Sequence, residues 1–380
     1  MENISMLFSS CTINNLVLRN RITMAPLYLG YANTDGTVSE LTLKHYRKMA
    51  RSGASMIVVE NAAVHESGMG APFTLRVDND SYIGGLSKLA ETIHSEGALA
   101  FLQINHAGRY AYTPNRLAPS PVQIKDIIPK EMTLQEINDT INAFAEAARR
   151  VRESGFDGVE LHGGTGYLIS QFVSPRLNTR NDIYGGTMEN RFRFPLETIK
   201  AVQKKVGHDY PVGYRFLADE LLPHGFHIDE AELLAKEIEK LGIAYISVMI
   251  GTHESFYIPP YVEMEKNECY MAEYASRIKK AVQKTPIITA GRIQTPEGAE
   301  NILKEGKADL IGLARVLFAD PLWPKKAQGL IEKPIVPCNP LCTFCTRRVM
   351  QGKIPYCTQW TKEEQQALLE QLGDRMADRE

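Results

Sequence analysis

The sequence lacks a long hydrophobic run, an excess of charge of one sign and a secretion signal. Its most apolar stretch, residues 243–250, is far shorter than the ~20 residues that a membrane-spanning helix needs. The 43 basic and 45 acidic residues give a net charge of −2, which argues against nucleic acid or an anionic membrane as a partner. Residues 1–5 have neither a basic start nor an apolar signal core, so we expect a cytoplasmic protein.

The sequence also lacks the G-x-G-x-x-G turn that an open, doubly wound dinucleotide-binding sheet would need. It has instead eight short strand-like runs, each followed by a helical pattern. The predicted strands are residues 21–26, 55–60, 98–104, 157–161, 212–216, 244–249, 286–290 and 309–313. Eight strand–helix units over ~300 residues predict an α/β fold, namely a closed (β/α)8 TIM barrel.

Three of the predicted helices have recognisable ends. The clearest, over 133–153, begins with a capping box of Thr133 and Glu136. A second is expected to begin at Asp229 and to end at Gly242, and a third has Thr295 as its cap. Before the first strand, we expect the first 18 residues to form a hairpin that closes the barrel floor.

Cysteine is scarce but clustered near the C-terminus. Two of the six cysteines, Cys11 and Cys269, stand apart and are expected to be unligated. In a reducing cytosol, the other four indicate an iron–sulfur centre, or alternatively a structural zinc site, rather than disulfides. These four are Cys338, Cys342, Cys345 and Cys357.

The chain is therefore expected to have three parts. Residues 1–333 form the barrel, 334–360 the cysteine-rich segment and 361–380 a polar C-terminal helix. That helix is too weakly apolar for a core position, so we expect it on the surface or in a subunit contact of a homo-oligomer. Its apolar residues are Leu368, Leu369, Leu372 and Met376.

Reactive groups of a barrel gather where its strands end, so the residues there form the candidate site. Paired glycine and arginine residues after the seventh and eighth strands predict a phosphate site, because backbone N–H groups approach closely and guanidinium groups bind the oxygens. Arg215 would supply a permanent positive charge where an anion forms. The strand-end residues are Gln103, His106, Arg109, His162, Thr165, Tyr167, Arg215, His253, Gly291, Arg292, Gly312 and Arg315.

Many separated segments resemble the old yellow enzyme family of FMN-dependent oxidoreductases. The most specific are 155–162 (GFDGVELH) and 167–175 (YLISQFVSP), followed by several positions between 178 and 194. Shorter matches lie at 20–21, 24–26, 103–109 and 118–120. The resemblance covers essentially the whole barrel.

This resemblance implies FMN on the top of the barrel, with NADH or NADPH as a candidate electron donor. Gln103 would hold the pyrimidine edge of the flavin, and Arg215 would lie near its N1 and O2 atoms. The backbone at Pro26 and Ala62 would meet the isoalloxazine ring. The phosphate would be held by Gly291, Arg292, Gly312 and Arg315.

The resemblance also implies an ene-reductase that transfers hydride from reduced flavin to an α,β-unsaturated carbonyl compound. His162 would polarise the carbonyl oxygen with Thr165, which replaces the His or Asn usual in the family. Tyr167 would protonate the α-carbon, with His253 as a relay. His106 and Arg109 are expected to fix the loop after the third strand. The candidate substrates are enones, enoates, dienoyl thioesters and unsaturated steroids.

The cysteine spacing C-x3-C-x2-C-x11-C resembles the 4Fe–4S site of the family branch that includes bacterial 2,4-dienoyl-CoA reductase and trimethylamine dehydrogenase. The second cysteine is displaced by one residue. The 251–254 run (GTHE) also resembles a loop of that reductase. Those relatives carry a further domain that binds FAD and a pyridine nucleotide, so electrons would come either directly from NAD(P)H or, through the cluster, from an external flavoprotein or ferredoxin.

Two rival functions stay open at this point. The first is an amine dehydrogenase or demethylase, which runs related chemistry in the opposite direction. The second is an electron-transfer flavoprotein subunit without an organic substrate of its own. The presence of both Tyr167 and His162 favours an enzyme, because a carrier needs neither.

Overall fold

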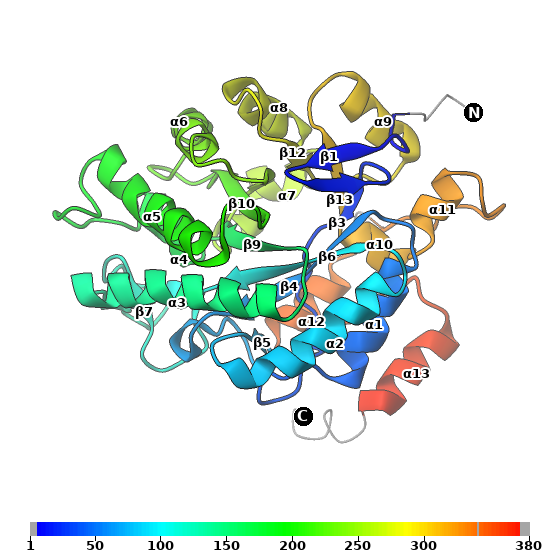
Figure 1. Cartoon of the computed structure of the whole chain (residues 1–380), viewed down its shortest axis with the longest axis horizontal. Helices are drawn as coiled ribbons and strands as arrows, with labels where there is room; N and C mark the ends of the chain where they lie inside the picture. Colours follow the sequence, from blue (N-terminus) through cyan, green and yellow to red (C-terminus); the bar gives the residue numbers. More distant parts are fainter. Residues whose placement is uncertain (1–5, 340–341, 373–380) are drawn as a thin grey trace.

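The computed structural model describes residues 6–339 and 342–372, and its centre is a closed barrel of parallel strands (Figure 1). The strands pair in the order β3-β13-β12-β11-β10-β9-β6-β4, and pairing of β3 with β4 closes the ring. All eight predicted strands, and the TIM barrel itself, are confirmed. The strands are β3 (Ile22–Met24), β4 (Met56–Ala63), β6 (Leu99–Asn105), β9 (Gly158–Gly163), β10 (Val212–Asp219), β11 (Tyr245–Ile250), β12 (Ile287–Thr289) and β13 (Leu310–Leu313).

Helices surround the barrel as an outer layer (Figure 1). The predicted capping box of α3 is confirmed, because Thr133 and Glu136 each accept the other's backbone N–H. Thr295 caps α9, also as predicted. The main helices are α1 (Glu40–Ala50), α2 (Ile83–His94), α3 (Leu134–Glu153), α5 (Met188–Val206), α6 (Ile228–Glu239), α8 (Ala272–Ala281), α9 (Pro296–Lys304), α10 (Arg315–Ala319) and α11 (Trp323–Ala327).

Helix α6 differs from its predicted bounds at both ends. It begins one residue before Asp229, with His227 as an N-cap that makes no side-chain bond, and it ends at Glu239 rather than near Gly242. Two acidic side chains in the first turns of α6 join it to a neighbouring helix. Asp229 and Glu232 both pair with Arg277 of α8 at 2.6 Å, which joins the two neighbouring helices.

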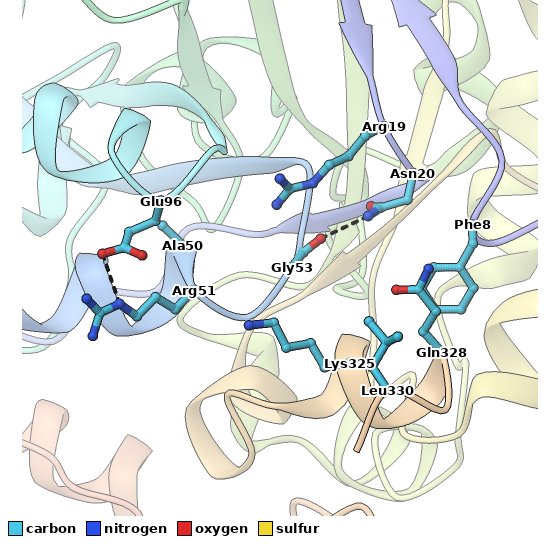
Figure 2. A pocket seen from close by; sticks show the side chains of 10 residues that line it. All are labelled: Phe8, Arg19, Asn20, Ala50, Arg51, Gly53, Glu96, Lys325, Gln328 and Leu330. Carbon is cyan, nitrogen blue, oxygen red and sulfur yellow. Dashed lines mark hydrogen bonds and ion pairs between the residues drawn. The ribbon is translucent and has the colours of Figure 1, made fainter. Parts of the chain in front are cut away.

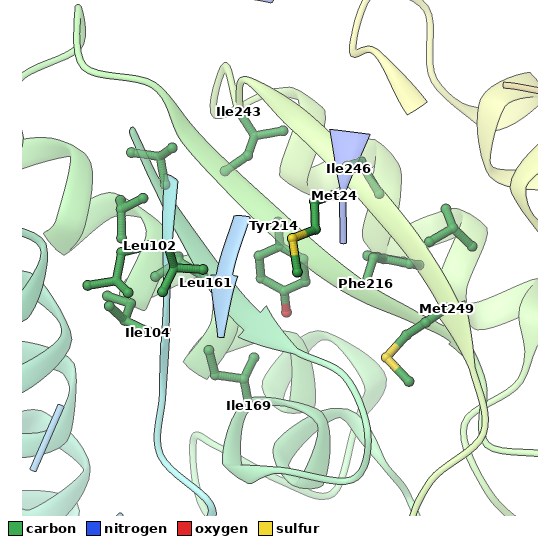
Figure 3. Packing of buried hydrophobic residues seen from close by; sticks show 14 of the residues in the cluster. Met24, Leu102, Ile104, Leu161, Ile169, Tyr214, Phe216, Ile243, Ile246 and Met249 are labelled. Atoms are coloured by element: carbon green, nitrogen blue, oxygen red, sulfur yellow. The ribbon is translucent and has the colours of Figure 1, made fainter. Parts of the chain in front are cut away.

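A short hairpin closes the bottom of the barrel, as expected. Strands β1 (Cys11–Ile13) and β2 (Leu16–Leu18) pair antiparallel. Ile13 and Leu18 pack on residues near the start of the barrel strands, including Phe101 and Tyr245. A larger core lies between the strands and the outer helices, and Figure 3 shows part of it around Tyr214.

The cysteine-rich segment and the last helix lie against the barrel. The segment contains α12 (Phe344–Met350), and the last helix is α13 (Lys362–Leu372). Leu368 and Leu372 of α13 are buried against Tyr31 and Phe318, so one side of this surface helix covers an apolar cluster of the barrel. Met376, which was expected in the same helix, lies outside the described residues.

A cavity of about 450 Å³ lies near the bottom end, where helices lead into strands. Figure 2 shows the ion pair of Arg51 and Glu96 on one side of it and Phe8 on the other. The Asn20 amide donates to the Gly53 carbonyl oxygen across 2.8 Å. Within 6–339 and 342–372, no helix is long and apolar enough to cross a membrane.

Candidate active site

A cavity of about 790 Å³ lies at the C-terminal end of the barrel strands. Ala62, which was expected at the flavin, is fully buried in β4 and does not line it, whereas its neighbour Asn61 does. Eight of the residues singled out from the sequence meet there. They are Pro26, Gln103, His162, Thr165, Tyr167, Arg215, His253 and Arg315.

The alternation of side chains along each strand brings these residues together. In β10, Tyr214 and Phe216 pack in the core under the helices, so Arg215 between them faces the barrel interior. In β9, Leu161 packs outward in the same way, and His162 faces inward. Polar residues at the strand ends are therefore collected on one inner surface.

A buried carboxylate organises the floor of this cavity. Glu160 is fully buried in β9 and accepts hydrogen bonds from the Gln103 amide (2.7 Å) and the Tyr245 hydroxyl (3.0 Å). Burial raises the pKa of Glu160, and the charge of Arg215 opposes this shift. Arg215 also donates to the Ser247 hydroxyl across 2.7 Å. The floor thus offers a fixed amide and a guanidinium group to a bound molecule.

His162 is held as a neutral hydrogen-bond donor. Burial, followed by the charges of Arg215 and His253, lowers its pKa well below the usual value. The Gly164 N–H donates to His162 Nδ1 across 3.3 Å, so we assign the ring proton to Nε2. A neutral imidazole with this tautomer can donate to a carbonyl oxygen in the cavity.

Tyr167 lies between two histidines. Its ring meets the His162 ring edge-on at 5.0 Å and the His253 ring at 5.2 Å between centroids. Burial raises the pKa of Tyr167 to about 12 and lowers that of His253 to about 4, and the Glu254 carboxylate opposes the latter shift. Near neutral pH the phenol keeps its proton and is a candidate proton donor.

Thr165 adopts a backbone conformation that β-branched residues rarely take. Its φ is +60°, and two contacts with the next loop hold it there. These contacts are a parallel bridge to Thr252 and a hydrogen bond from the His253 N–H to the Thr165 carbonyl oxygen. The Thr165 hydroxyl donates to the Met249 sulfur across 3.5 Å. These backbone contacts hold Thr165 in its strained conformation and join the two loops of the site.

The predicted phosphate residues also meet, around an adjoining cavity of about 150 Å³. Gly291, Arg292, Gly312 and Arg315 all line it. Gly291 has φ +95°, and a Cβ there would lie 2.7 Å from the Met271 side chain, so only glycine fits without displacement. Arg215 and Arg315 line both cavities, so a long ligand could occupy the two together.

The four clustered cysteines line a third, much smaller cavity, together with Arg315. All four are free thiols. Cys338 also lines the phosphate cavity and Cys345 the main cavity, so the cysteines lie beside the candidate active site. Among the described residues, no three His, Cys, Asp or Glu side chains are grouped so as to hold a single metal ion.

Sequence reasoning missed several residues of the site. Glu160 and Ser247 received no role, although both lie at inward positions of their strands, a signal that alternation could have given. Phe256 and Tyr261, in the connection after β11, also line the main cavity, and neither was singled out from the sequence. The wall from 343–355 was not expected, because the cysteine segment was treated as an appendage.

The top of this TIM barrel combines candidate proton donors, a fixed positive charge and an adjoining cavity lined by glycine and arginine residues, a layout that suits a flavin nucleotide. Residues 6–333 match the NADH:flavin oxidoreductase / NADH oxidase family, and the chain belongs to that family. The predicted family is confirmed.

The chain is 43% identical over 368 residues to an NADH oxidase of Thermoanaerobacter brockii, covering 94% of this chain and 56% of that relative. The chain spans about half the length of the first curated relatives that it matches. Its fold is similar to a 2-naphthoyl-CoA reductase in complex with 2-naphthoyl-CoA (TM-score 0.89, 31% identity, 94% of this chain and 57% of that one). It is also similar to a histamine dehydrogenase from Rhizobium sp. 4-9 (TM-score 0.83, 26% identity, 94% and 52%).

Proposed function

We propose that this protein is an FMN-dependent ene-reductase that acts on the C=C bond of an α,β-unsaturated carbonyl compound. The observation that carries the proposal is the pairing of a neutral His162 with a protonated Tyr167 in one cavity. One is a donor for a carbonyl oxygen and the other a proton donor for a carbon atom. The reductase among the similar structures supports the same direction of reaction.

The residues around the two joined cavities fit FMN. The main cavity is within the range of about 300–1,000 Å³ that is usual for small-molecule sites. Gln103 and Arg215 would hold the ring system, with Pro26 at its edge, and the phosphate would lie among Gly291, Arg292, Gly312 and Arg315. When bound, FMN supplies the hydride for the reaction.

The chain's own residues handle the carbonyl oxygen and the proton. His162 would donate its Nε2 proton in a hydrogen bond to the carbonyl oxygen, with Thr165 beside it, and so stabilise the negative charge that develops there. Tyr167 would give its phenolic proton to the α-carbon. His253, in ring contact with Tyr167, would return a proton to it.

We further propose that Cys338, Cys342, Cys345 and Cys357 hold a 4Fe–4S cluster. Four free thiols around one small cavity fit the ligand set of such a cluster. The cluster would supply one-electron transfer beside the flavin. Electrons would enter either from NADH or NADPH at the flavin or, through the cluster, from an external flavoprotein or ferredoxin. The cytoplasmic location and the homo-oligomer stay predictions.

Anaerobic half-reactions of the flavin-loaded protein test the proposed function. The flavin is reduced with dithionite, so that the result does not depend on the natural donor, and is then mixed with enals, enones, enoates, dienoyl thioesters and unsaturated steroids. In Tyr167→Phe, we expect reoxidation of the flavin by the substrate to slow by about 10²–10⁴-fold. Flavin reduction by dithionite or NADH should not change. Equal losses in both half-reactions would contradict the role of Tyr167.

The likeness to a histamine dehydrogenase keeps amine oxidation as the second candidate. The oxidised protein is therefore mixed with primary, secondary and tertiary amines under the same conditions. Flavin bleaching by an amine, together with no reoxidation by any unsaturated carbonyl compound, would replace the proposed function with this one. No response to either panel would favour an electron-transfer subunit.

A further inference from the structure

We propose that Glu254 is a positioning residue, whose carboxylate, held between Arg109 and Arg176, keeps the His253 ring against Tyr167. This inference rests on the proposed function, because it concerns how Tyr167 regains its proton. Three features of the barrel top support it: the edge-on and tilted ring contacts of His253 and Tyr167, the loop that carries His253, and the ion pairs of Glu254.

Aromatic side chains contact one another in a series that starts at the main cavity and continues into the loops at the top of the barrel. His162 contacts Tyr167, Tyr167 contacts His253, and His253 contacts Tyr110, with centroid distances of 5.0, 5.2 and 4.7 Å. The Arg109 guanidinium lies over the Tyr110 ring at 5.6 Å. His253 is thus enclosed between two tyrosine rings, and a small shift of its loop would separate it from Tyr167.

The loop that carries His253 is joined to neighbouring segments mainly through its backbone, including a hydrogen bond from the Gly251 N–H to the Asp219 carbonyl oxygen at 2.8 Å. Its backbone is joined to the Tyr167 loop by the hydrogen bond from the His253 N–H to Thr165, at 3.2 Å. The Thr252 N–H is satisfied inside the loop by the Ser255 hydroxyl at 2.7 Å. The next residue, Glu254, is the one whose side chain reaches two other loops.

Glu254 joins three loops of the barrel top through its carboxylate. One oxygen pairs closely with Arg176, in the loop after α4 (Leu168–Val173), and the other lies 3.6 Å from Arg109, in the loop after β6. Arg109 is only 1% exposed, and its backbone N–H and guanidinium also bond to Gln171 and to the Gln123 carbonyl oxygen. Because Arg109 is anchored in this way, Glu254 is fixed to a rigid part of the site.

The proton balance of the step defines what His253 must do. As the α-carbon forms its C–H bond, the O–H bond of Tyr167 breaks. The tyrosine oxygen then takes a proton from one nitrogen of His253, while the other nitrogen takes a proton from solvent. A neutral ring can pass a proton in this way only if it stays within reach of the phenol, and Glu254 maintains that position.

The main test compares Glu254→Gln with the wild-type holoenzyme. We expect reoxidation of reduced flavin by an unsaturated carbonyl substrate to slow by about 10–100-fold, while flavin reduction and substrate KM stay within about twofold. Glu254→Asp, which keeps the charge, should recover part of the rate. The matched control is Glu263→Gln, in the same connection, because the ion pair that this carboxylate makes among the described residues is with the surface residue Lys266.

A double-mutant cycle separates positioning from a general structural effect. If Glu254 acts through His253, then Glu254→Gln should cause little further slowing in a His253→Asn background. Equal slowing in both backgrounds would overturn the proposal, as would equal losses in both half-reactions. If Glu254→Gln fails to fold, Arg176→Gln removes the more exposed partner and should show a smaller loss in the same half-reaction.

A readout without substrate keeps this inference separate from the proposed function. In a crystal structure of Glu254→Gln, we expect the His253 and Tyr167 rings to stand farther apart than 5.2 Å. An unchanged distance would overturn the positioning role even in an active enzyme. Failure of the wild-type protein to reduce any unsaturated carbonyl compound would instead count against the proposed function.

Discussion

The two ends of the barrel are built by the same strands, yet they bury groups of opposite character. At the bottom, the β1–β2 hairpin brings Ile13 and Leu18 onto Phe101, Tyr245 and Leu310, and this cluster is almost wholly apolar. At the top, the inner face carries amide, carboxylate, imidazole and guanidinium groups around two cavities. The bottom is closed by packing, and the top is shaped for binding.

The change from apolar to polar side chains occurs between two successive inward-facing positions of the same strand. Phe101 and Gln103 lie two residues apart on the inner face of β6, and Tyr245 and Ser247 do so in β11. Glu160 joins the two layers, because it accepts from Tyr245 below and from Gln103 at the level of the site. Buried polar groups at the top are thus supported by the apolar layer, and the two ends should respond differently to mutation.

The largest expected effect is at the top, in the cysteine segment. Cys342→Ser should abolish the proposed 4Fe–4S cluster, because it removes one of the four proposed ligands, while the barrel stays folded. We expect the iron and sulfide content of anaerobically purified protein to fall to background, together with loss of the broad visible absorption of the cluster. The flavin content should change little, since Cys342 does not line the main cavity or the phosphate cavity.

Cys269→Ser is the matched control, because this half-buried cysteine lies far along the chain from the four proposed ligands. It should keep full iron and sulfide. Wild-type protein that contains one zinc ion per chain and no sulfide would contradict the cluster and favour the zinc alternative.

The next largest expected effect is on the free energy of unfolding, and it comes from the apolar cluster at the bottom of the barrel. The Phe101 ring is fully buried between Gly158 and Tyr245, and a Cβ on Gly158 would lie 2.1 Å from it. Phe101→Ala should therefore lower the free energy of unfolding by about 3–5 kcal/mol, measured by urea denaturation. Val17→Ala in the β1–β2 hairpin, where the side chain is 70% exposed, should change it by less than about 0.5 kcal/mol.

Phe101→Ala also tests the separation of the two ends. At a temperature where the variant is folded, substrate-driven reoxidation of the flavin should stay within about twofold of wild type. A loss comparable to that of Tyr167→Phe would mean that the bottom layer positions the site through Tyr245 and Glu160, so that the two ends would no longer be separable.

The sequence predicts the parts of the molecule that depend on local patterns. Buried β-branched runs located all eight strands, and a barrel places strand ends together, so strand order alone predicts that Gln103, His162 and Arg215 share one site. The capping box at Thr133 was correct because its two bonds are local. Helix α6 begins at Ile228, one residue before the expected Asp229, and the pairing of Asp229 with Arg277 of α8 is a contact that no local pattern predicts.

Other features depend on contacts between distant segments, which no local pattern records. The burial of Leu368 arises because α13 lies over Tyr31 and Phe318, which are far from it in the sequence. The ion pairs of Glu254 with Arg109 and Arg176 likewise join three separate loops. Single charged residues in loops are usually solvated, so their pairing becomes visible only in three dimensions.

The smallest expected effect is electrostatic and again at the bottom, where α2 ends beside the start of β9. His94 Nε2 lies 2.7 Å from the Asp157 carboxylate, and this bond raises the pKa of His94. Stabilisation by the charged pair should be complete below the unfolded pKa of about 6.5 and should disappear as the pH rises through the folded pKa. Because the His94 side chain is 38% exposed, we expect the pair to stabilise the folded protein by less than about 1 kcal/mol.

The Tm difference between wild type and His94→Asn should shrink between pH 6 and 8.5, while the exposed control His208→Asn shows no such trend. A difference that grows with pH would contradict the ion pair.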